Sequence, residues 1–351
     1  MRTPLPGSGR RSPFPHNAWY AVAGADEVGR TPLARRLLDT PVVLYRSTTG
    51  VAIALEDRCA HRPVRLSDGY LSGDVIHSSY TGFGYGPDGH CVSVPTQDQV
   101  PYGAAVGSFP VRDDGTFVWV WVGEAGLAAL RTAPDTDLLR ADGWVTIGGV
   151  VEIAAGVNLL MDNFCDITHV AQLDRAIAPP VLSSGPTPPM EVEVSETSVR
   201  FTRRFPAAPL APWHAQVLEL PEDAEHVQVE EGEFVSPGFW VDRWTVEVAG
   251  HSGRDGRQTF VFSHALVPVS ATATRHVWRV SRNFARSAAA DGTLAPLFTA
   301  YYQRVGSVLE QMQQILDAEG PRPEVAVAAD AAVSHVRRIM RRLMAEELGS
   351  A

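Results

Sequence analysis

The chain has 351 residues, 45% of them hydrophobic and 20% charged, and a formal net charge of −10. That length allows two domains with a large core, and the composition is that of an ordinary globular protein. An acidic chain without a concentrated basic stripe is a poor candidate for nucleic-acid binding.

The same features bear on compartment. No apolar run approaches the ~20 residues that span a bilayer, and the first residues lack the apolar core of a signal peptide. The sequence has three cysteines, and an odd, sparse set argues against a disulfide framework. We therefore expect a cytoplasmic protein without membrane contact.

The first part of the chain predicts a flexible N-terminus and a small β domain. Residues 1–15 are rich in Pro, Gly, Ser and Arg and are expected to be loosely ordered. Residues 16–125 show short alternating stretches separated by Gly, Pro and Asp turns, which predict an all-β domain. The clearest strands are predicted at 19–22, 41–45, 51–55 and 117–121.

Residues 126–351 predict a second domain of the α+β class, with a mainly antiparallel sheet flanked by helices. Residues 179–189 contain five prolines and are expected to be loop. Strands are predicted at 144–153, 191–194, 198–205, 243–248, 259–267 and 276–284. Helices are predicted at 156–173, 296–319 and 330–347.

A polar group within the first of these helices is the strongest candidate site. Asp166 and His169 are three residues apart, so on a helix they share a face, and Asp174 follows five residues later. Such a group can be a metal site or an acid/base pair, and it can also be a helix N-terminus rich in polar caps. A second, weaker signal is Cys59-Ala60-His61, which can equally be a buried cysteine beside a surface histidine.

The stretch from Asn158 to Asp174 resembles the mononuclear-iron segment of Rieske oxygenase large subunits, in their aromatic O-demethylase branch. That segment reads D-N-x-x-D-x-x-H-x-x-x-x-H. Asp162, Asn163, Asp166 and His169 match it, whereas Asp174 stands where the family has its second iron-binding histidine. The resemblance covers nearly the whole chain, and it implies a Rieske β domain followed by an oxygenase-type domain.

The resemblance also implies a [2Fe–2S] cluster held by C-x-H and a later C-x-x-H. Cys59 and His61 match the first pair, but Ser78 and Thr81 stand in the places of the second. A serine hydroxyl is protonated near neutral pH and is a hard donor, whereas the cluster iron prefers thiolate sulfur. We interpret Cys59, His61, Ser78 and Thr81 as vestigial cluster positions.

At the mononuclear site, the resemblance implies two histidines and a carboxylate on the late helix. Val305 falls at the carboxylate position, in register with Glu310 further along that helix. With Asp174 at the second histidine position, both metal sites are expected to be lost. The expectation is a protein without cofactors.

The predicted function follows from that expectation. It is a metal-free, non-oxidative enzyme that catalyses a cyclisation, cycloaddition, rearrangement or similar proton-assisted step on a bulky, apolar, natural-product-like substrate. His169 and Asp174, with Asp166 nearby, are the predicted catalytic residues. The predicted substrate-binding residues are Asn163, Phe164, Tyr302 and Val305.

Two other functions stay open. One is a non-catalytic pseudoenzyme or binding partner of an active oxygenase, and the other is a conventional iron oxygenase with atypical ligands. Because family members are commonly ring-like trimers, the resemblance also implies a homo-oligomer.

Overall fold

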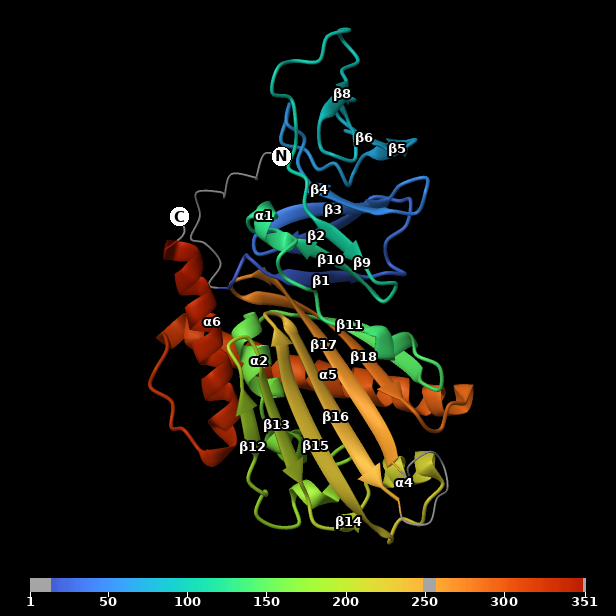
Figure 1. Ribbon diagram of the computed structural model, residues 1–351, viewed down its shortest axis with the longest axis vertical. Coiled ribbons are helices and arrows are strands. Elements are labelled where there is room, and N and C mark those ends of the chain that lie inside the picture. The colour runs from blue at the N-terminus through green and yellow to red at the C-terminus, as the bar shows by residue number, and fades with distance from the viewer. Residues whose placement is uncertain (1–13, 249–256, 350–351) are drawn as a thin grey trace. The chain divides into compact units, whose positions relative to one another are not determined.

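The computed structural model describes residues 14–248 and 257–349 (Figure 1). The described residues form two compact units. The first comprises residues 14–134, 267–271 and 347–349, and the second comprises residues 135–248, 257–266 and 272–346. Residues 1–13 of the predicted flexible N-terminus lie outside the described residues.

The first unit is built from three small antiparallel sheets. One has the order β1-β10-β9, from strands Trp19–Gly24, Phe117–Trp121 and Val111–Asp113. Another has the order β2-β3-β4, from Leu33–Leu37, Thr40–Arg46 and Ala52–Glu56. The third has the order β5-β6-β7-β8, from Tyr70–Ser72, Val75–His77, Gly84–Tyr85 and Cys91–Ser93. A short helix, α1, follows at Ala125–Ala128.

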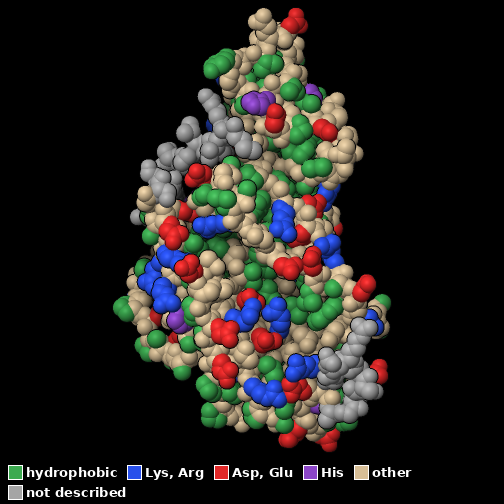
Figure 2. Space-filling model, viewed as in Figure 1, with side chains coloured by type: hydrophobic (Ala, Val, Ile, Leu, Met, Phe, Trp, Pro, Cys, Tyr) green, Lys and Arg blue, Asp and Glu red, His purple; other side chains and the backbone are tan. Residues whose placement is uncertain are grey.

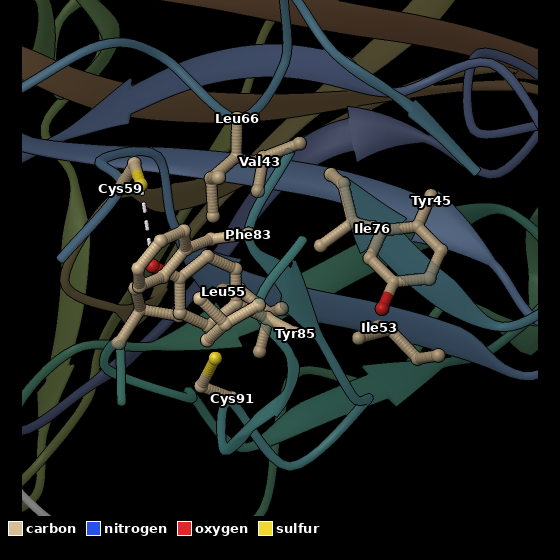
Figure 3. Close-up of a cluster of buried hydrophobic side chains, with 12 residues drawn as sticks. Val43, Tyr45, Ile53, Leu55, Cys59, Leu66, Ile76, Phe83, Tyr85 and Cys91 are labelled. Atoms are coloured by element: carbon tan, nitrogen blue, oxygen red, sulfur yellow. Dashed lines mark hydrogen bonds between the residues drawn. The ribbon is translucent and has the colours of Figure 1, made fainter. Parts of the chain in front are cut away.

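The core of the first unit is dominated by aromatic and β-branched residues. Every residue of β1 and β10 is buried, which explains why these strands read as continuous apolar runs. A second cluster packs Val43, Leu55 and Tyr85 against the loop that carries Cys59 (Figure 3). Burial of these side chains provides the hydrophobic stabilisation of the unit.

The second unit is organised around an eight-stranded sheet in the order β11-β18-β17-β16-β15-β13-β12, with β14 paired to β15. Every pairing given for its strands is antiparallel. The strands are Val145–Ile153 (β11), Glu191–Val194 (β12), Val199–Arg204 (β13), Ala208–Pro209 (β14), Glu225–Ser236 (β15), Phe239–Glu247 (β16), Arg257–Ser270 (β17) and Ala273–Arg282 (β18).

The two faces of this sheet differ. Buried and partly exposed residues alternate along β15, as expected for a strand with one face in the core. The outer face carries a mixture of acidic and basic side chains (Figure 2), including the ion pairs of Arg200 with Glu233 and of Arg204 with Glu247. The inner face contains the core of the unit.

Helices cover the inner face. The longest, α5, spans Ala288–Glu319, and α6 spans Ala331–Gly349. A Cβ atom added at Gly306 of α5 would lie 3.2 Å from the Ile153 side chain, so this glycine permits close packing of α5 on β11. The shorter segments are η1 (Asp137–Arg140), α2 (Val157–Phe164), η2 (Ile167–His169), α3 (Val170–Leu173), η3 (Pro180–Leu182), α4 (Pro212–Leu218) and η5 (Ala328–Asp330).

The predicted α+β class is confirmed, but several element bounds differ from the prediction. The helix predicted at 156–173 is interrupted at Asp166, whose backbone is extended and whose side chain accepts a hydrogen bond from the Thr168 amide. This capping carboxylate begins a new helical segment instead of continuing the old one. Helix α5 begins at Ala288, capped by Ser287, and not at Pro296. Strand β15 and helix α4 were not predicted.

No helix in the described ranges, 14–248 and 257–349, is long and apolar enough to cross a membrane.

Candidate functional site

The main cavity of the second unit lies between the inner face of the sheet and the helices. It encloses about 780 Å³ of space, including its open mouth. A largely apolar lining with a few polar groups is typical of small-molecule sites. Eight aromatic residues contribute to its wall: Phe164, Trp213, Trp244, Phe260, Phe262, Phe298, Tyr301 and Tyr302.

His169 lies at this cavity, and each of its ring nitrogens has a partner. Nδ1 is 2.8 Å from the Asp166 carbonyl oxygen, and Nε2 is 3.0 Å from the Tyr301 hydroxyl. The carbonyl fixes Nδ1 as the protonated nitrogen, so Nε2 accepts from Tyr301. Burial lowers the pKa of His169, which keeps the ring neutral near neutral pH.

The two acids predicted to act with His169 have other partners. The Asp166 carboxylate accepts hydrogen bonds from the amide and hydroxyl of Thr168. Asp174 ends α3, and its carboxylate forms an ion pair with Arg304 on α5. Neither acid lines the cavity. The predicted pairing of His169 with Asp174 is therefore not what the structure shows. His169 Nε2 is hydrogen-bonded to the Tyr301 hydroxyl, and the Asp174 carboxylate is paired with Arg304.

The predicted substrate-binding residues divide into two groups. Phe164 and Tyr302 line the cavity. Asn163 and Val305 do not: Val305 is buried in the core, and the Asn163 Nδ2 atom is buried without a hydrogen-bond partner in the described part of the chain.

A buried polar chain at the cavity was missed from the sequence. Asp242 on β16 lies 3.4 Å from His264 Nε2 on β17, and His264 Nδ1 lies 3.0 Å from His276 Nε2 on β18. Trp240 donates a 2.7 Å hydrogen bond to the other oxygen of Asp242. The Phe164 ring stacks on His264 with 4.0 Å between centroids. This arrangement offers a carboxyl group and two imidazoles that can exchange a proton.

The electrostatics of this chain follow from burial. Burial raises the pKa of Asp242 to about 8, whereas the same loss of water lowers the pKa of His264 to about 3. Burial and the neighbouring His264 also lower the pKa of His276. Near neutral pH, Asp242 is largely protonated and both imidazoles are neutral.

A second buried acid, Glu230 on β15, also lines the cavity. Its Oε2 atom accepts a 2.9 Å hydrogen bond from Arg203, and both side chains are about 1–2% exposed. Burial raises the pKa of Glu230, and the guanidinium of Arg203 opposes that rise. We describe the pair as ionised, because Arg203 without an anionic partner would be an uncompensated buried charge.

Three polar atoms at the cavity have no hydrogen-bond partner within residues 14–248 and 257–349. They are Glu230 Oε1, Trp244 Nε1 and His214 Nε2. Burial lowers the pKa of His214 to about 3, so its ring is neutral. Buried polar atoms are usually satisfied, so their concentration here marks a place where a bound molecule can supply the missing partners.

In the first unit, Cys59 is packed into a cluster of buried side chains (Figure 3). Its Sγ atom is 3.2 Å from the Tyr85 hydroxyl, which also accepts a 3.0 Å hydrogen bond from the Ala60 amide. Burial acts to raise the pKa of Cys59, but hydrogen bonds from Tyr85 and nearby backbone outweigh it, and the pKa is lowered. Through these two hydrogen bonds, Tyr85 on β7 holds the loop that carries Cys59 in place.

The other three positions assigned to the cluster lie around the same loops. His61 is exposed and stacks on Phe83, with 4.6 Å between centroids. Ser78 is buried, and its hydroxyl accepts a long hydrogen bond from the Tyr80 amide. The Thr81 hydroxyl is buried and lacks a partner in the described residues.

Nowhere in the described ranges do three or more His, Cys, Asp or Glu side chains gather closely enough to hold one metal ion.

Comparisons with known proteins follow the division into two units. Residues 18–110 match the Rieske [2Fe-2S] domain, and residues 153–346 match the vanillate O-demethylase oxygenase C-terminal domain. The chain belongs to the Rieske oxygenase large-subunit family. The resemblance predicted from Asp162, Asn163, Asp166 and His169 is therefore confirmed at the level of the family.

Individual Rieske oxygenase relatives cover nearly the whole chain. The toluene-4-sulfonate monooxygenase system iron-sulfur subunit of Comamonas testosteroni is 29% identical over 351 residues, which cover 96% of this chain and 99% of that protein. The vanillate O-demethylase oxygenase subunit of a Pseudomonas species is 28% identical over 346 residues, covering 95% and 96%. The crystal structure of dicamba monooxygenase bound to 3,6-dichlorosalicylic acid superimposes with a TM-score of 0.86 at 27% identity, covering 94% of this chain and 98% of that one.

These Rieske oxygenase relatives contradict the function predicted from the sequence. That prediction was a metal-free, non-oxidative enzyme of the cyclase type with degenerate metal sites, whereas the relatives are named as monooxygenase and demethylase components. The prediction gave a few substituted positions more weight than a likeness that extends over the whole chain. Substitutions at individual positions do not define a different reaction.

Proposed function

We propose that this Rieske oxygenase family member binds a small, largely aromatic molecule in the cavity of its second unit. The observation that carries the proposal is the cavity wall, where eight aromatic side chains surround a few polar groups. Aromatic walls favour a flat apolar ligand through burial of surface and through stacking. The polar groups would orient it.

His169 and Tyr301 supply one such polar contact. The Tyr301 hydroxyl donates to His169 Nε2, and its oxygen can still accept a hydrogen bond from a ligand. Phe164 and Tyr302 supply aromatic surface next to it. We assign ligand contact to His169, Tyr301, Phe164 and Tyr302, and a supporting role to Asp166, whose carbonyl orients the imidazole.

The family implies a [2Fe–2S] cluster and a mononuclear iron, and the side chains around Cys59 and His169 have other partners in this structure. Around Cys59 the nearest polar partners are the hydroxyls of Tyr85 and Ser78, which are poor donors to cluster iron. Around His169 the partner is a tyrosine hydroxyl, and Asp174 is paired with Arg304. Ligand binding as proposed does not depend on either group.

A calorimetric titration with 2-phenylethanol tests the binding proposal. A ligand of this size in an apolar cavity is expected to bind with a Kd on the order of 0.1–1 mM. Val170→Trp would fill the cavity that Val170 lines, and it should abolish binding. Val150→Trp, at an exposed position of β11, is the matched control and should bind like the parent chain. Equal binding by both variants would place the site elsewhere.

Oxygenation of the bound molecule is the second candidate function, and the names of the relatives favour it. It is tested by measuring iron and inorganic sulfide after anaerobic reconstitution, followed by oxygen consumption with a chemical reductant and 2-phenylethanol. Stoichiometric iron with ligand-dependent oxygen consumption would establish this function. If 2-phenylethanol binds equally well before and after reconstitution, the binding proposal stands without it.

We also propose, from the family resemblance, that the chain assembles as a homo-trimer. Light scattering coupled to size-exclusion chromatography would measure the mass directly, and a mass equal to that of one chain would contradict the proposal.

A further inference from the structure

Two of the side chains that line the cavity are buried acids. Asp242 and Glu230 both line it, on the neighbouring strands β16 and β15. An ionised Asp242 raises the pKa of Glu230, so the two carboxyl groups interact. Asp242 stays protonated because its ionised form would lack a positive partner in this buried place, and a cationic ligand would supply one.

The positive groups nearby are already engaged. Arg203 is bound to Glu230, and Arg243, the cationic side chain among the described lining residues, forms a 3.5 Å ion pair with Glu233. The imidazoles of His214 and His264 are neutral. A carboxylate or sulfonate entering the cavity would therefore meet two acids and no unengaged cation among the lining residues that the structure describes.

Polar atoms that lack partners provide an independent indication of a ligand. The Trp244 indole N–H, the His214 Nε2 atom and the Glu230 Oε1 atom belong to residues that line this cavity, are unpaired within the described residues, and lie on side chains at least nine-tenths buried. An unpaired carboxylate oxygen needs a hydrogen-bond donor. The ligand that satisfies Glu230 must therefore carry an N–H or O–H group.

The aromatic wall favours a charged donor over a neutral one. The faces of Trp, Tyr and Phe rings attract cations, most strongly where water is excluded. Carboxyl groups enclosed by aromatic rings are thus well suited to an organic ammonium group. Asp242 keeps one oxygen on the Trp240 indole N–H, and the other, 3.4 Å from His264 Nε2, is the one that would contact such a group.

We propose that the ligand of this cavity is an aromatic amine whose protonated nitrogen contacts Asp242 and Glu230, and that aromatic carboxylates and sulfonates are excluded. This inference rests on the proposed binding function and specifies its ligand class. It also separates this chain from two relatives that are named for acids, vanillate and toluene-4-sulfonate.

Three probes of similar shape test the proposal by calorimetric titration of the full chain: 2-phenylethylamine, 2-phenylethanol and phenylacetate. The amine should bind about tenfold more tightly than the alcohol, which corresponds to ~1.4 kcal/mol, and phenylacetate should bind more weakly than either. Phenylacetate binding as tightly as the amine would overturn the proposal while leaving the proposed binding function intact. If none of the three binds, the binding function itself fails.

Two variants assign the preference to the acids. Asp242→Asn should reduce the amine's advantage over the alcohol to within about threefold. Glu231→Gln, which alters the next residue after Glu230 on the opposite face of β15, is the matched control and should keep the full preference. An unchanged preference in Asp242→Asn would overturn the assignment. The comparison of the three probes on the parent chain decides the proposal even if this variant does not fold.

Discussion

The two faces of the large sheet hold the same kind of side chain in opposite electrostatic states. Glu247 on the outer face of β16 is paired with Arg204 and Arg257, and the hydrogen bond from Arg204 is the largest cause that lowers its pKa. Asp242, on the inner face of the same strand, has a pKa raised to about 8 by burial. They are five positions apart along the strand, so they point to opposite sides of the sheet.

This contrast shows where the chain has room for function. Acids on the outer face can interact with either arginine or water at little cost in free energy, because they stay in contact with solvent. Inner-face acids must be satisfied by the protein or by a ligand. The unpaired atoms of Glu230, Trp244 and His214 all belong to the enclosed side.

The largest effect is expected from breaking the buried ion pair. Arg203→Leu would leave Glu230 as an unpaired buried acid, and the free energy of unfolding should fall by about 3–5 kcal/mol. Urea denaturation monitored by circular dichroism measures it. Arg200→Gln, on the outer face of the same strand and paired with Glu233, is the control and should shift the urea midpoint far less. Equal shifts in the two variants would contradict the distinction between the faces.

The next effect concerns pH. The folded-state pKa of Asp242, about 8, lies above the unfolded value of about 3.9, so between these values the folded chain holds a proton that the unfolded chain has lost. Stability contributed by this group is therefore lost as pH rises through that interval, by about 1.4 kcal/mol per pH unit. Asp242→Asn should remove this decline, as measured by urea unfolding at pH 5, 6, 7 and 8.

The outer-face counterpart should behave in the opposite sense. Because the folded-state pKa of Glu247 is lowered, its contribution is present above its unfolded pKa and is lost as pH falls through the folded value. Glu247→Gln should thus leave the profile between pH 5 and 8 unchanged and alter only the acidic end. A slope at pH 5–8 that changes equally in both variants would show that burial is not what separates the two acids.

These details show what the sequence could and could not predict. The family register pointed to His169, Phe164 and Tyr302, and all three line one cavity in the structure. It could not reveal that Asp174 pairs with Arg304, 130 residues away, because nothing local to Asp174 indicates its partner. The α+β class followed from alternation and length of the segments, which are local properties.

The buried acids of the inner face, Asp242 and Glu230, could not be predicted from the sequence for a different reason. Glu230 and Glu231 form part of an acidic run that reads as a solvated surface, and only the register of β15 decides which of them is buried. A shift of one residue would exchange the two faces. His264 gave a weak signal, as a polar residue within the apolar strand β17, but its contacts with Asp242 and His276 depend on the neighbouring strands.

A smaller effect is expected from Tyr301, the tyrosine of α5 that contacts His169. Tyr301→Phe removes the hydroxyl that donates to Nε2 and leaves that nitrogen unpaired, and the free energy of unfolding should fall by about 0.5–1.5 kcal/mol. Tyr70→Phe makes the same chemical change at an exposed tyrosine and should be neutral. Thermal and urea unfolding of the two variants would measure the difference, and identical stabilities would argue that the His169–Tyr301 hydrogen bond contributes nothing.

The smallest effect should come from an outer-face ion pair. Arg204 on β13 reaches Glu247 on β16 across the strand between them, β15, from a largely exposed position. Most of the energy of this interaction is therefore offset by contact with water. Arg204→Gln should lower the urea midpoint slightly at low ionic strength. Near 1 M salt, where the Debye length is about 3 Å, the variant and the parent chain should unfold together. The Arg203→Leu defect, by contrast, should persist at high salt because its charges are enclosed. If high salt were to abolish the stability loss of both variants, the Arg203–Glu230 pair would be open to solvent. The acids of the inner face would then not be buried, and the proposed amine site depends on their burial.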